Sequence, residues 1–161
     1  MSEIGEEELR RLVPDVRKQV TVQATPEHCF RVLTARPSDW WPPTHTLVTN
    51  RGGLGMEPRV GGRVYEWDRD GSEATWGIVL TWEPPYRMSF TWRVNSRWEE
   101  IPDDEKASVI EVTVTPVDAM ATTVELAHVR LHRHAEHAVK IHAALDGPSP
   151  GETLSLYAKA I

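Results

Sequence analysis

The sequence predicts an α+β fold in which a curved antiparallel β-sheet wraps around a C-terminal helix. A strand-like segment and a helix open the chain, a run of alternating segments fills its middle, and helical patterns close it. Strands joined by short turns must be antiparallel. Such a sheet has one face that helices must cover. A sheet that curls around a helix without closing on it leaves a space in which ligands often bind.

The length of 161 residues predicts one domain. We expect residues 1–16 to be a flexible N-terminal tail and residues 17–161 to form the domain. Val20 and Val22 alternate with polar residues, which predicts the first strand at 17–24. Thr25 as N-cap and Pro26 at the first helical position predict a helix directly after it. This helix must end before Pro37, because the residue before a proline is pushed out of the helical region.

The middle of the chain predicts antiparallel strands. The segment "RVYEWD" ends at a turn, residues 69–72, that contains a glycine. In "EATWGIVLTWE", simple alternation predicts one face that carries Trp76, Ile78, Leu80 and Trp82. Alternation also predicts one apolar face on each of two later strands. The first face carries Met88, Phe90, Trp92 and Val94, and the second carries Ile110, Val112 and Val114.

The end of the chain predicts helices. The segment "HRHAEHAVKIHAAL" is the first, and Asp146-Gly147-Pro148 is a plausible stop. The last segment carries a stripe with helical spacing, formed by Leu154, Tyr157, Ala158 and Ile161.

Composition argues against several classes of function and location. The net charge of −6 argues against a nucleic-acid partner, which requires a basic surface. One cysteine, Cys29, allows no intramolecular disulfide and fits a reducing compartment. No apolar run is long enough for a membrane span, and the N-terminus is acidic where a signal peptide would be basic. We therefore expect a cytoplasmic protein.

The motif "DWWPPTH" places Trp40 and Trp41 before two prolines and His45. Adjacent residues in an extended segment point in opposite directions, and each proline ring fixes its own φ. We interpret the motif as a rigid aromatic lid beside a cavity entrance, with His45 at its end. The alternative is a structural plug beneath the loop.

Other candidate ligand-binding residues lie on the predicted strands. Trp76 and Trp92 would form either the aromatic wall of a pocket or part of the core. His128 and Arg130 fall in phase with apolar neighbours, and a buried charge needs a partner. Glu66 is the candidate partner if it points inward, and a His–carboxylate pair could act as an acid and base. The alternative is a structural hydrogen bond.

The histidines near the C-terminus do not predict a metal site. No cysteine or carboxylate completes a tetrahedral set at a familiar spacing. We expect neither a metal nor a cofactor, and no nucleophile motif such as Gly-x-Ser-x-Gly occurs.

Several motifs in order resemble a known family. The segment "VTVQATPEHCFRVLT", then "DWWPPTH", then "EPRVGGRVYEWDRDGSEATWGIVLTWEPPYRMSFTW", then "VELAHVRLHRHA" are similar to the SRPBCC superfamily, with its START-like, helix-grip fold. Within it, they resemble the branch of activator of heat-shock protein 90 ATPase homologues. The resemblance covers Gln19 to Ala138. It implies a small hydrophobic ligand for stand-alone members, while the best-known members act on the chaperone.

Three functions remain open at this point. The first is a binding protein with an internal cavity for a small hydrophobic molecule. The second is an enzyme on the same scaffold, cyclase or hydrolase-like, that uses His128 with a carboxylate. The third is a protein-interaction module such as a chaperone co-factor. The fold alone does not separate them, because one scaffold hosts many functions.

Overall fold

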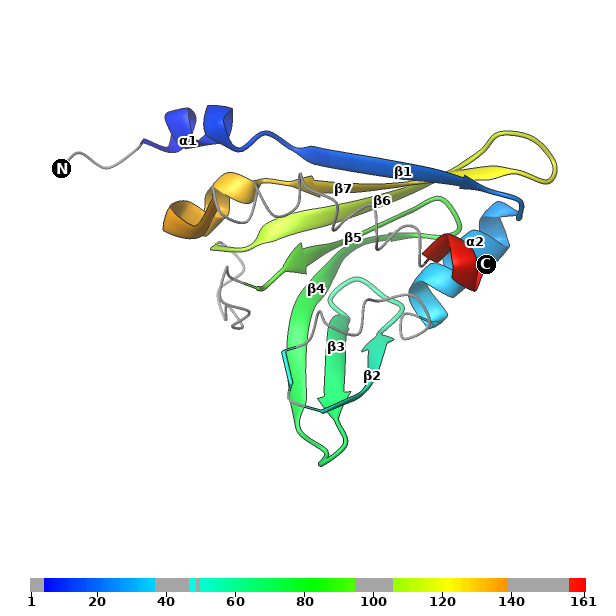
Figure 1. Ribbon diagram of the computed structural model, residues 1–161, viewed down its shortest axis with the longest axis horizontal. Helices are drawn as coiled ribbons and strands as arrows, with labels where there is room; N and C mark the ends of the chain where they lie inside the picture. Colours follow the sequence, from blue (N-terminus) through cyan, green and yellow to red (C-terminus); the bar gives the residue numbers. More distant parts are fainter. Residues whose placement is uncertain (1–4, 37–46, 49, 95–105, 139–156) are drawn as a thin grey trace.

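A computed structural model describes residues 5–36, 47–48, 50–94, 106–138 and 157–161. Within these residues the strands form a seven-stranded antiparallel sheet in the order β1-β7-β6-β5-β4-β3-β2 (Figure 1). The elements are α1 (Glu6–Leu12), β1 (Val16–Val22), α2 (Pro26–Ala35), β2 (Arg51–Met56), β3 (Arg63–Asp68), β4 (Glu73–Glu83), β5 (Arg87–Trp92), β6 (Ser108–Pro116), β7 (Thr122–Val129) and the 3₁₀-helix η3 (Leu131–His137).

Local signals fixed helix α2 and the turn between β3 and β4 as predicted. The Thr25 hydroxyl accepts a hydrogen bond from the His28 N–H at 3.2 Å, and Pro26 occupies the first helical position of α2. The helix ends at Ala35, ahead of Pro37. The turn between β3 and β4 contains Gly71 with φ of 96°, a left-handed conformation that glycine adopts without strain.

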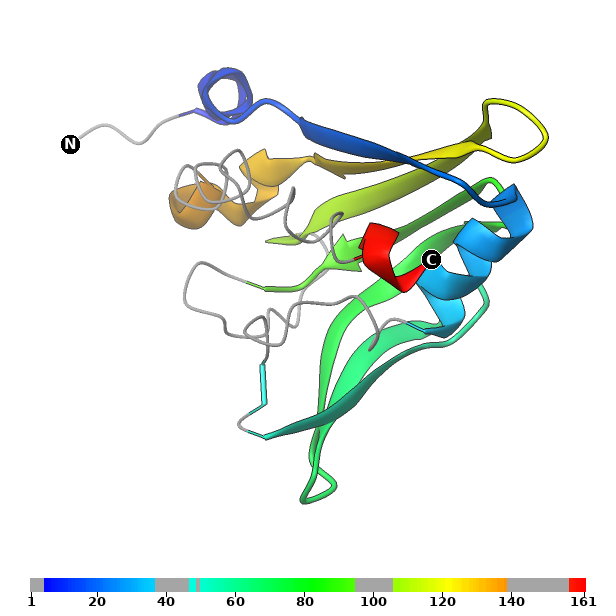
Figure 2. The same ribbon diagram turned by 45° about the vertical axis from the view of Figure 1, so that its right-hand side comes forward.

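The curl of the sheet is concentrated in β4. This long strand pairs with β3 on one side and β5 on the other, and it bends so that β2 and β3 turn away from the β1–β7 end (Figures 1 and 2). The pairing register shifts between Val64 and Tyr65 and again between Val79 and Thr81. Irregularities of this kind bend a strand and increase its local twist.

The same irregularities overturn the predicted face of β4. Trp76 is buried and Trp82 packs edge-on against Phe30, as alternation predicted. Leu80, however, is 43% exposed, whereas Val79 is 1% exposed and belongs to the core. A residue that a bulge inserts shifts every side chain beyond it to the other face. The first irregularity therefore exchanges the faces at Val79 and Leu80, and the second restores the predicted face at Trp82.

The inner face of the sheet is covered by α2 and by the C-terminal residues 157–161, of which 157–160 are helical (Figure 2). The Tyr157 hydroxyl donates a hydrogen bond to the Cys29 carbonyl at 2.7 Å, which joins the two segments. Tyr157, Ala158 and Ile161 contact the main core, as their helical spacing predicted, while Leu154 lies outside the described residues. The fold is the predicted α+β helix-grip arrangement.

Cys29 is fully buried, as expected for an unreactive thiol. Burial raises the pKa of this thiol. Hydrogen bonds with Tyr157 and Thr122 oppose the effect of burial. The neutral thiol therefore behaves as a small apolar side chain.

The N-terminal segment differs from the expected flexible tail. Residues 6–12 form α1, and Leu9 and Val13 are buried in a second apolar cluster. Their partners there are Val16, Leu131 and Ala138. Local sequence patterns do not predict this contact, because Leu9 and Val13 meet residues more than a hundred positions away.

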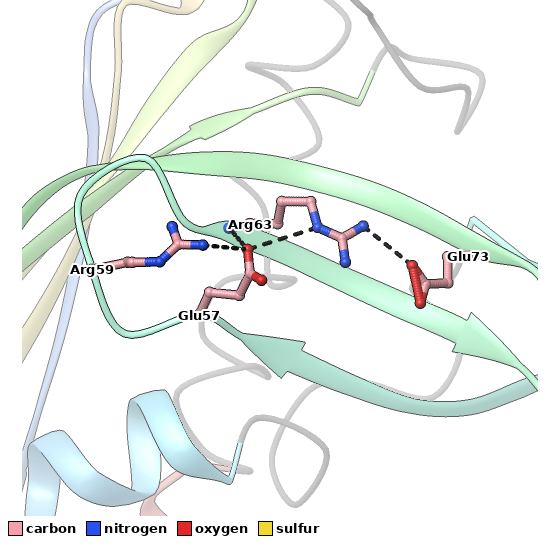
Figure 3. A network of polar contacts seen from close by, with 4 residues as sticks. All are labelled: Glu57, Arg59, Arg63 and Glu73. Carbon is pink, nitrogen blue, oxygen red and sulfur yellow. Dashed lines mark hydrogen bonds and ion pairs between the residues drawn. The ribbon is translucent and has the colours of Figure 1, made fainter.

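A charged network holds the connection between β2 and β3 (Figure 3). Glu57 Oε1 accepts a hydrogen bond from the Arg63 backbone N–H at 2.7 Å and lies 3.8 Å from Arg59 Nη2. The Arg63 guanidinium also reaches Glu73 Oε1 at 3.2 Å. All four side chains are partly exposed, so these ion pairs contribute little stability individually. They fix the geometry of a turn at the start of the strand that carries Glu66.

We expect Tyr157→Phe to lower the free energy of unfolding by about 1–2 kcal/mol, because the Cys29 carbonyl loses a buried hydrogen bond. Urea unfolding followed by tryptophan fluorescence measures the change. Tyr86→Phe is the matched control, since Tyr86 is 51% exposed. Equal effects of the two substitutions would contradict the contact between α2 and the C-terminal segment.

Candidate binding site on the inner face of the sheet

A row of buried polar and aromatic side chains crosses the inner face of the sheet. It runs from Glu66 on β3 through Trp76 on β4 and Trp92 on β5 to His128 on β7. The Trp76 and Trp92 rings lie 5.0 Å apart between centroids, and the Trp92 and His128 rings lie 5.7 Å apart. All four side chains are shielded from solvent, and we call them the inner-face row. Four of the sequence candidates are thus brought together.

The two tryptophans meet because β4 and β5 approach closely at Gly77. A Cβ atom at this position would lie 1.7 Å from the Thr91 carbonyl oxygen, so no larger residue fits there. The Thr91 hydroxyl accepts a hydrogen bond from the Ile78 N–H at 2.9 Å. The Trp76 carbonyl accepts one from the Arg93 N–H at 2.7 Å. These bonds bring the backbones that carry Trp76 and Trp92 into contact.

Glu66 is fully buried, and its two carboxylate oxygens have different surroundings. Oε1 accepts hydrogen bonds from the backbone N–H groups of Leu47 and Val48. Oε2 has no hydrogen-bond partner among the described residues. Burial raises the pKa of Glu66, and the Leu47 and Val48 N–H groups, Arg51 and Trp76 oppose this rise.

His128 lies at the other end of the row in a hydrogen-bonded group with Ser108 and His134. The Ser108 hydroxyl lies 2.6 Å from His128 Nε2 and 2.7 Å from His134 Nε2. The Ser108 backbone N–H also donates to His134 Nε2 at 3.2 Å, so this nitrogen is an acceptor. The Ser108 hydroxyl then donates to His134, and we assign the proton of His128 to Nε2, which donates to Ser108.

His128 is neutral at physiological pH. Desolvation, followed by the charge interaction with His134, lowers the pKa of His128 to about 3. A buried imidazole avoids the cost of carrying an unpaired charge in this way.

The hypothesis of a His128–Glu66 pair is wrong for the described structure. Their strands, β7 and β3, are separated in the sheet by β6, β5 and β4. The described hydrogen-bond partner of His128 is instead Ser108 on β6, which in turn bonds to His134 of η3. The two tryptophans lie between the groups that the sequence analysis placed in contact.

Arg130 also departs from its predicted position. β7 ends at Val129, and Arg130 is exposed with φ of 57°. The chain turns there into η3, so the alternation that continued through His128 no longer applies. Trp40, Trp41 and His45 lie outside the described residues, and their part in an aromatic lid stays a prediction.

Sequence reasoning missed Ser108, His134 and Arg51. Ser108 is in phase with Ile110 and Val112, so the alternation that placed those residues inward also indicated an inward serine. No local pattern indicated His134, which reaches Ser108 from a 3₁₀-helix where an α-helix was expected.

Among the described residues, no group of three or more His, Cys, Asp or Glu side chains has the arrangement of a metal site. In the same part of the chain, no helix is both long and apolar enough to cross a membrane.

The family model described as Activator of Hsp90 ATPase homolog 1-like protein matches residues 23–146. The chain belongs to this family. No curated protein sequence matches it significantly. Among solved structures, the anthrahydroquino-γ-pyrone synthase Txn09, complexed with a ligand abbreviated SUM, is 58% identical. The match covers 92% of this chain and 97% of the synthase, with a TM-score of 0.66.

Two other solved members of this structural group extend the comparison. The self-sacrificing resistance protein CalC from Micromonospora echinospora is 28% identical, with a TM-score of 0.64 over 92% of this chain and 95% of CalC. The Aha1 dimer from Colwellia psychrerythraea is 16% identical, with a TM-score of 0.59 over 89% of this chain and 92% of that protein. At 16% identity, the likeness to Aha1 concerns the fold alone.

The lowered pKa of His128 predicts a loss of stability in acid. The unfolded state, with a histidine pKa near 6.5, binds the proton more readily than the folded state does. The contribution of neutral His128 to the free energy of unfolding is fully present above pH 6.5. It falls by up to about 1.4 kcal/mol per pH unit as the pH drops toward about 3. Urea unfolding from pH 7 to pH 4 measures the slope. His128→Gln keeps a donor to Ser108 and should show a shallower slope, whereas identical slopes would contradict a neutral buried His128.

Gly77→Ala should lower the free energy of unfolding by about 3 kcal/mol or more, because the new methyl group collides with the Thr91 backbone. Gly5→Ala is the control, since a Cβ at Gly5 meets no atom within 4 Å. Thermal melting of both variants provides the comparison. A Gly77→Ala protein as stable as the control would show that β4 and β5 do not approach in this way.

Proposed function

We propose that this family member binds a polycyclic aromatic molecule of the anthrahydroquinone type and closes a γ-pyrone ring on it. The observation that carries the proposal is the 58% identity to the anthrahydroquino-γ-pyrone synthase, which extends over nearly the whole of both chains. Identity at this level over this length favours a shared reaction class more strongly than a shared fold would.

The inner-face row supports the proposal physically. A flat polycyclic ligand presents a large apolar face with oxygen atoms at its edge. Trp76 and Trp92 are the aromatic side chains of the row, and indole rings favour offset or edge-on contacts with other aromatic rings. Glu66 and the Ser108–His128 pair place polar groups at the two ends of this surface. A mainly apolar site with few polar anchors is typical of small-molecule binding.

A binding role without turnover is the second candidate. The 28% identity to a resistance protein over 92% of this chain favours it. The two candidates share the same site and differ in whether a product forms. The chaperone co-factor hypothesis rests on likeness in fold alone.

Binding is tested with a dihydroxyanthraquinone, reduced by dithionite under anaerobic conditions to the anthrahydroquinone. We expect the reduced probe to quench tryptophan fluorescence and to raise the melting temperature, because it binds only the folded state. Trp92→Phe should weaken binding about two- to fivefold, since it removes part or most of an aromatic contact worth about 1 kcal/mol.

Trp67→Phe is the matched control, because Trp67 is 38% exposed and lies over Gly52 and Gly53 rather than in the row. Its binding constant should match that of the unmodified protein. A larger effect at Trp67 than at Trp92, or no binding at all, would contradict the proposed site. Product formation, followed by mass spectrometry with the substrate described below, separates the synthase from the binding-only role.

A further inference from the structure

We propose that Glu66 is the general acid of the ring closure and donates a proton from Oε2 to a carbonyl oxygen of the ligand. This inference rests on the proposed function and assigns a residue and a step to it.

The hydrogen bonds of Glu66 decide where its proton resides. Oε1 already faces the two N–H donors of Leu47 and Val48, and a proton on the same atom would compete with them. Oε2 is buried and has no described partner at hydrogen-bond geometry, although the Trp76 side chain is near enough to favour the ionised form. A protonated Glu66 therefore carries its proton on Oε2, as a donor that has no acceptor there. Buried donors are nearly always paired, so a ligand oxygen is the expected acceptor.

The electrostatic surroundings keep the proton on Glu66 to a higher pH than usual. Burial raises the pKa, and the only charged side chain that interacts with the carboxylate among the described residues is Arg51 of β2. The cross-strand neighbours Leu54 on β2 and Ala74 on β4 carry no charge. Arg51 and the backbone N–H groups keep the ionised form accessible, so the group is able to release its proton and take one back.

His128 is a weaker candidate for this role. It is buried, its Nε2 is engaged with the Ser108 hydroxyl, and it is neutral at physiological pH. It lies at the opposite end of the two tryptophans from Glu66 and fits a role in orienting the ligand.

The chemistry of γ-pyrone closure needs a group of this kind. We take the substrate class to be an anthrahydroquinone with a 1,3-diketone side chain beside a phenol. The phenol oxygen bonds to the distal carbonyl carbon. The π electrons of this C=O bond move to the carbonyl oxygen, which takes the proton from Glu66. The phenol releases its proton to the Glu66 carboxylate, which is then protonated again. The new hydroxyl then leaves as water with a proton from Glu66, and the neighbouring carbon returns one as the ring double bond forms. One water is lost, and no oxidant is needed.

The test uses this 1,3-diketone with Glu66→Gln, which keeps an oxygen for the Leu47 and Val48 N–H groups but cannot donate a carboxyl proton. We expect kcat to fall by about a hundredfold to ten-thousandfold while fluorescence quenching by the reduced anthraquinone is retained. Glu111→Gln, which changes an exposed carboxylate on β6, is the control and should leave kcat unchanged. In the unmodified protein, kcat should decline as the pH rises through the raised pKa of Glu66, and Glu66→Gln should lack this decline.

The outcomes separate this inference from the proposed function. Turnover that survives Glu66→Gln within about threefold overturns the role of Glu66 and leaves the synthase intact. A protein that binds the probe without turnover overturns both the synthase and the general acid. If Glu66→Gln does not fold, infrared difference spectroscopy of the unmodified protein, titrated from acid to alkaline pH with bound probe, decides. A carboxyl C=O band that shifts on probe binding at neutral pH supports the inference, and a fully ionised Glu66 there overturns it.

Discussion

The close contact between β4 and β5 at Gly77 is the constraint on which the rest of the site depends. The backbone carbonyl of Thr91 lies so close to Gly77 that a Cβ atom at position 77 would collide with it. As a result Trp76 and Trp92 contact each other at a tilted angle across the two strands, and the row continues to Glu66 on one side and His128 on the other. A single packing requirement thereby positions aromatic surface and polar groups from four strands.

The two ends of the row respond to the same burial in ways that complement each other. Burial raises the pKa of Glu66 and lowers the pKa of His128, so both groups are driven toward their neutral forms. At one end of the row the carboxyl group holds its proton to a higher pH than an exposed glutamate, and at the other end the imidazole stays neutral. Titratable groups with such divergent environments are a recognised mark of functional sites.

The sequence predicted those features that depend on residues close together along the chain. The Thr25–Pro26 cap, the Gly71 turn and the inward faces of β5 and β6 follow from residues that lie close in sequence. The bulges in β4 depend on pairing with β3 and β5, so alternation misassigned Leu80 and Val79. The predicted partner of His128 was wrong for a similar reason. Strand pairing brings Ser108 to His128, and the turn into η3 brings His134 to Ser108.

The most direct test of the central claim is nuclear magnetic resonance of the indole N–H groups while the reduced dihydroxyanthraquinone is added. The account predicts that the Trp76 and Trp92 signals shift or broaden at probe concentrations that leave the partly exposed Trp67 unchanged. Shifts confined to Trp67, or no shift at Trp76 and Trp92 at saturating probe, would contradict binding at the inner-face row.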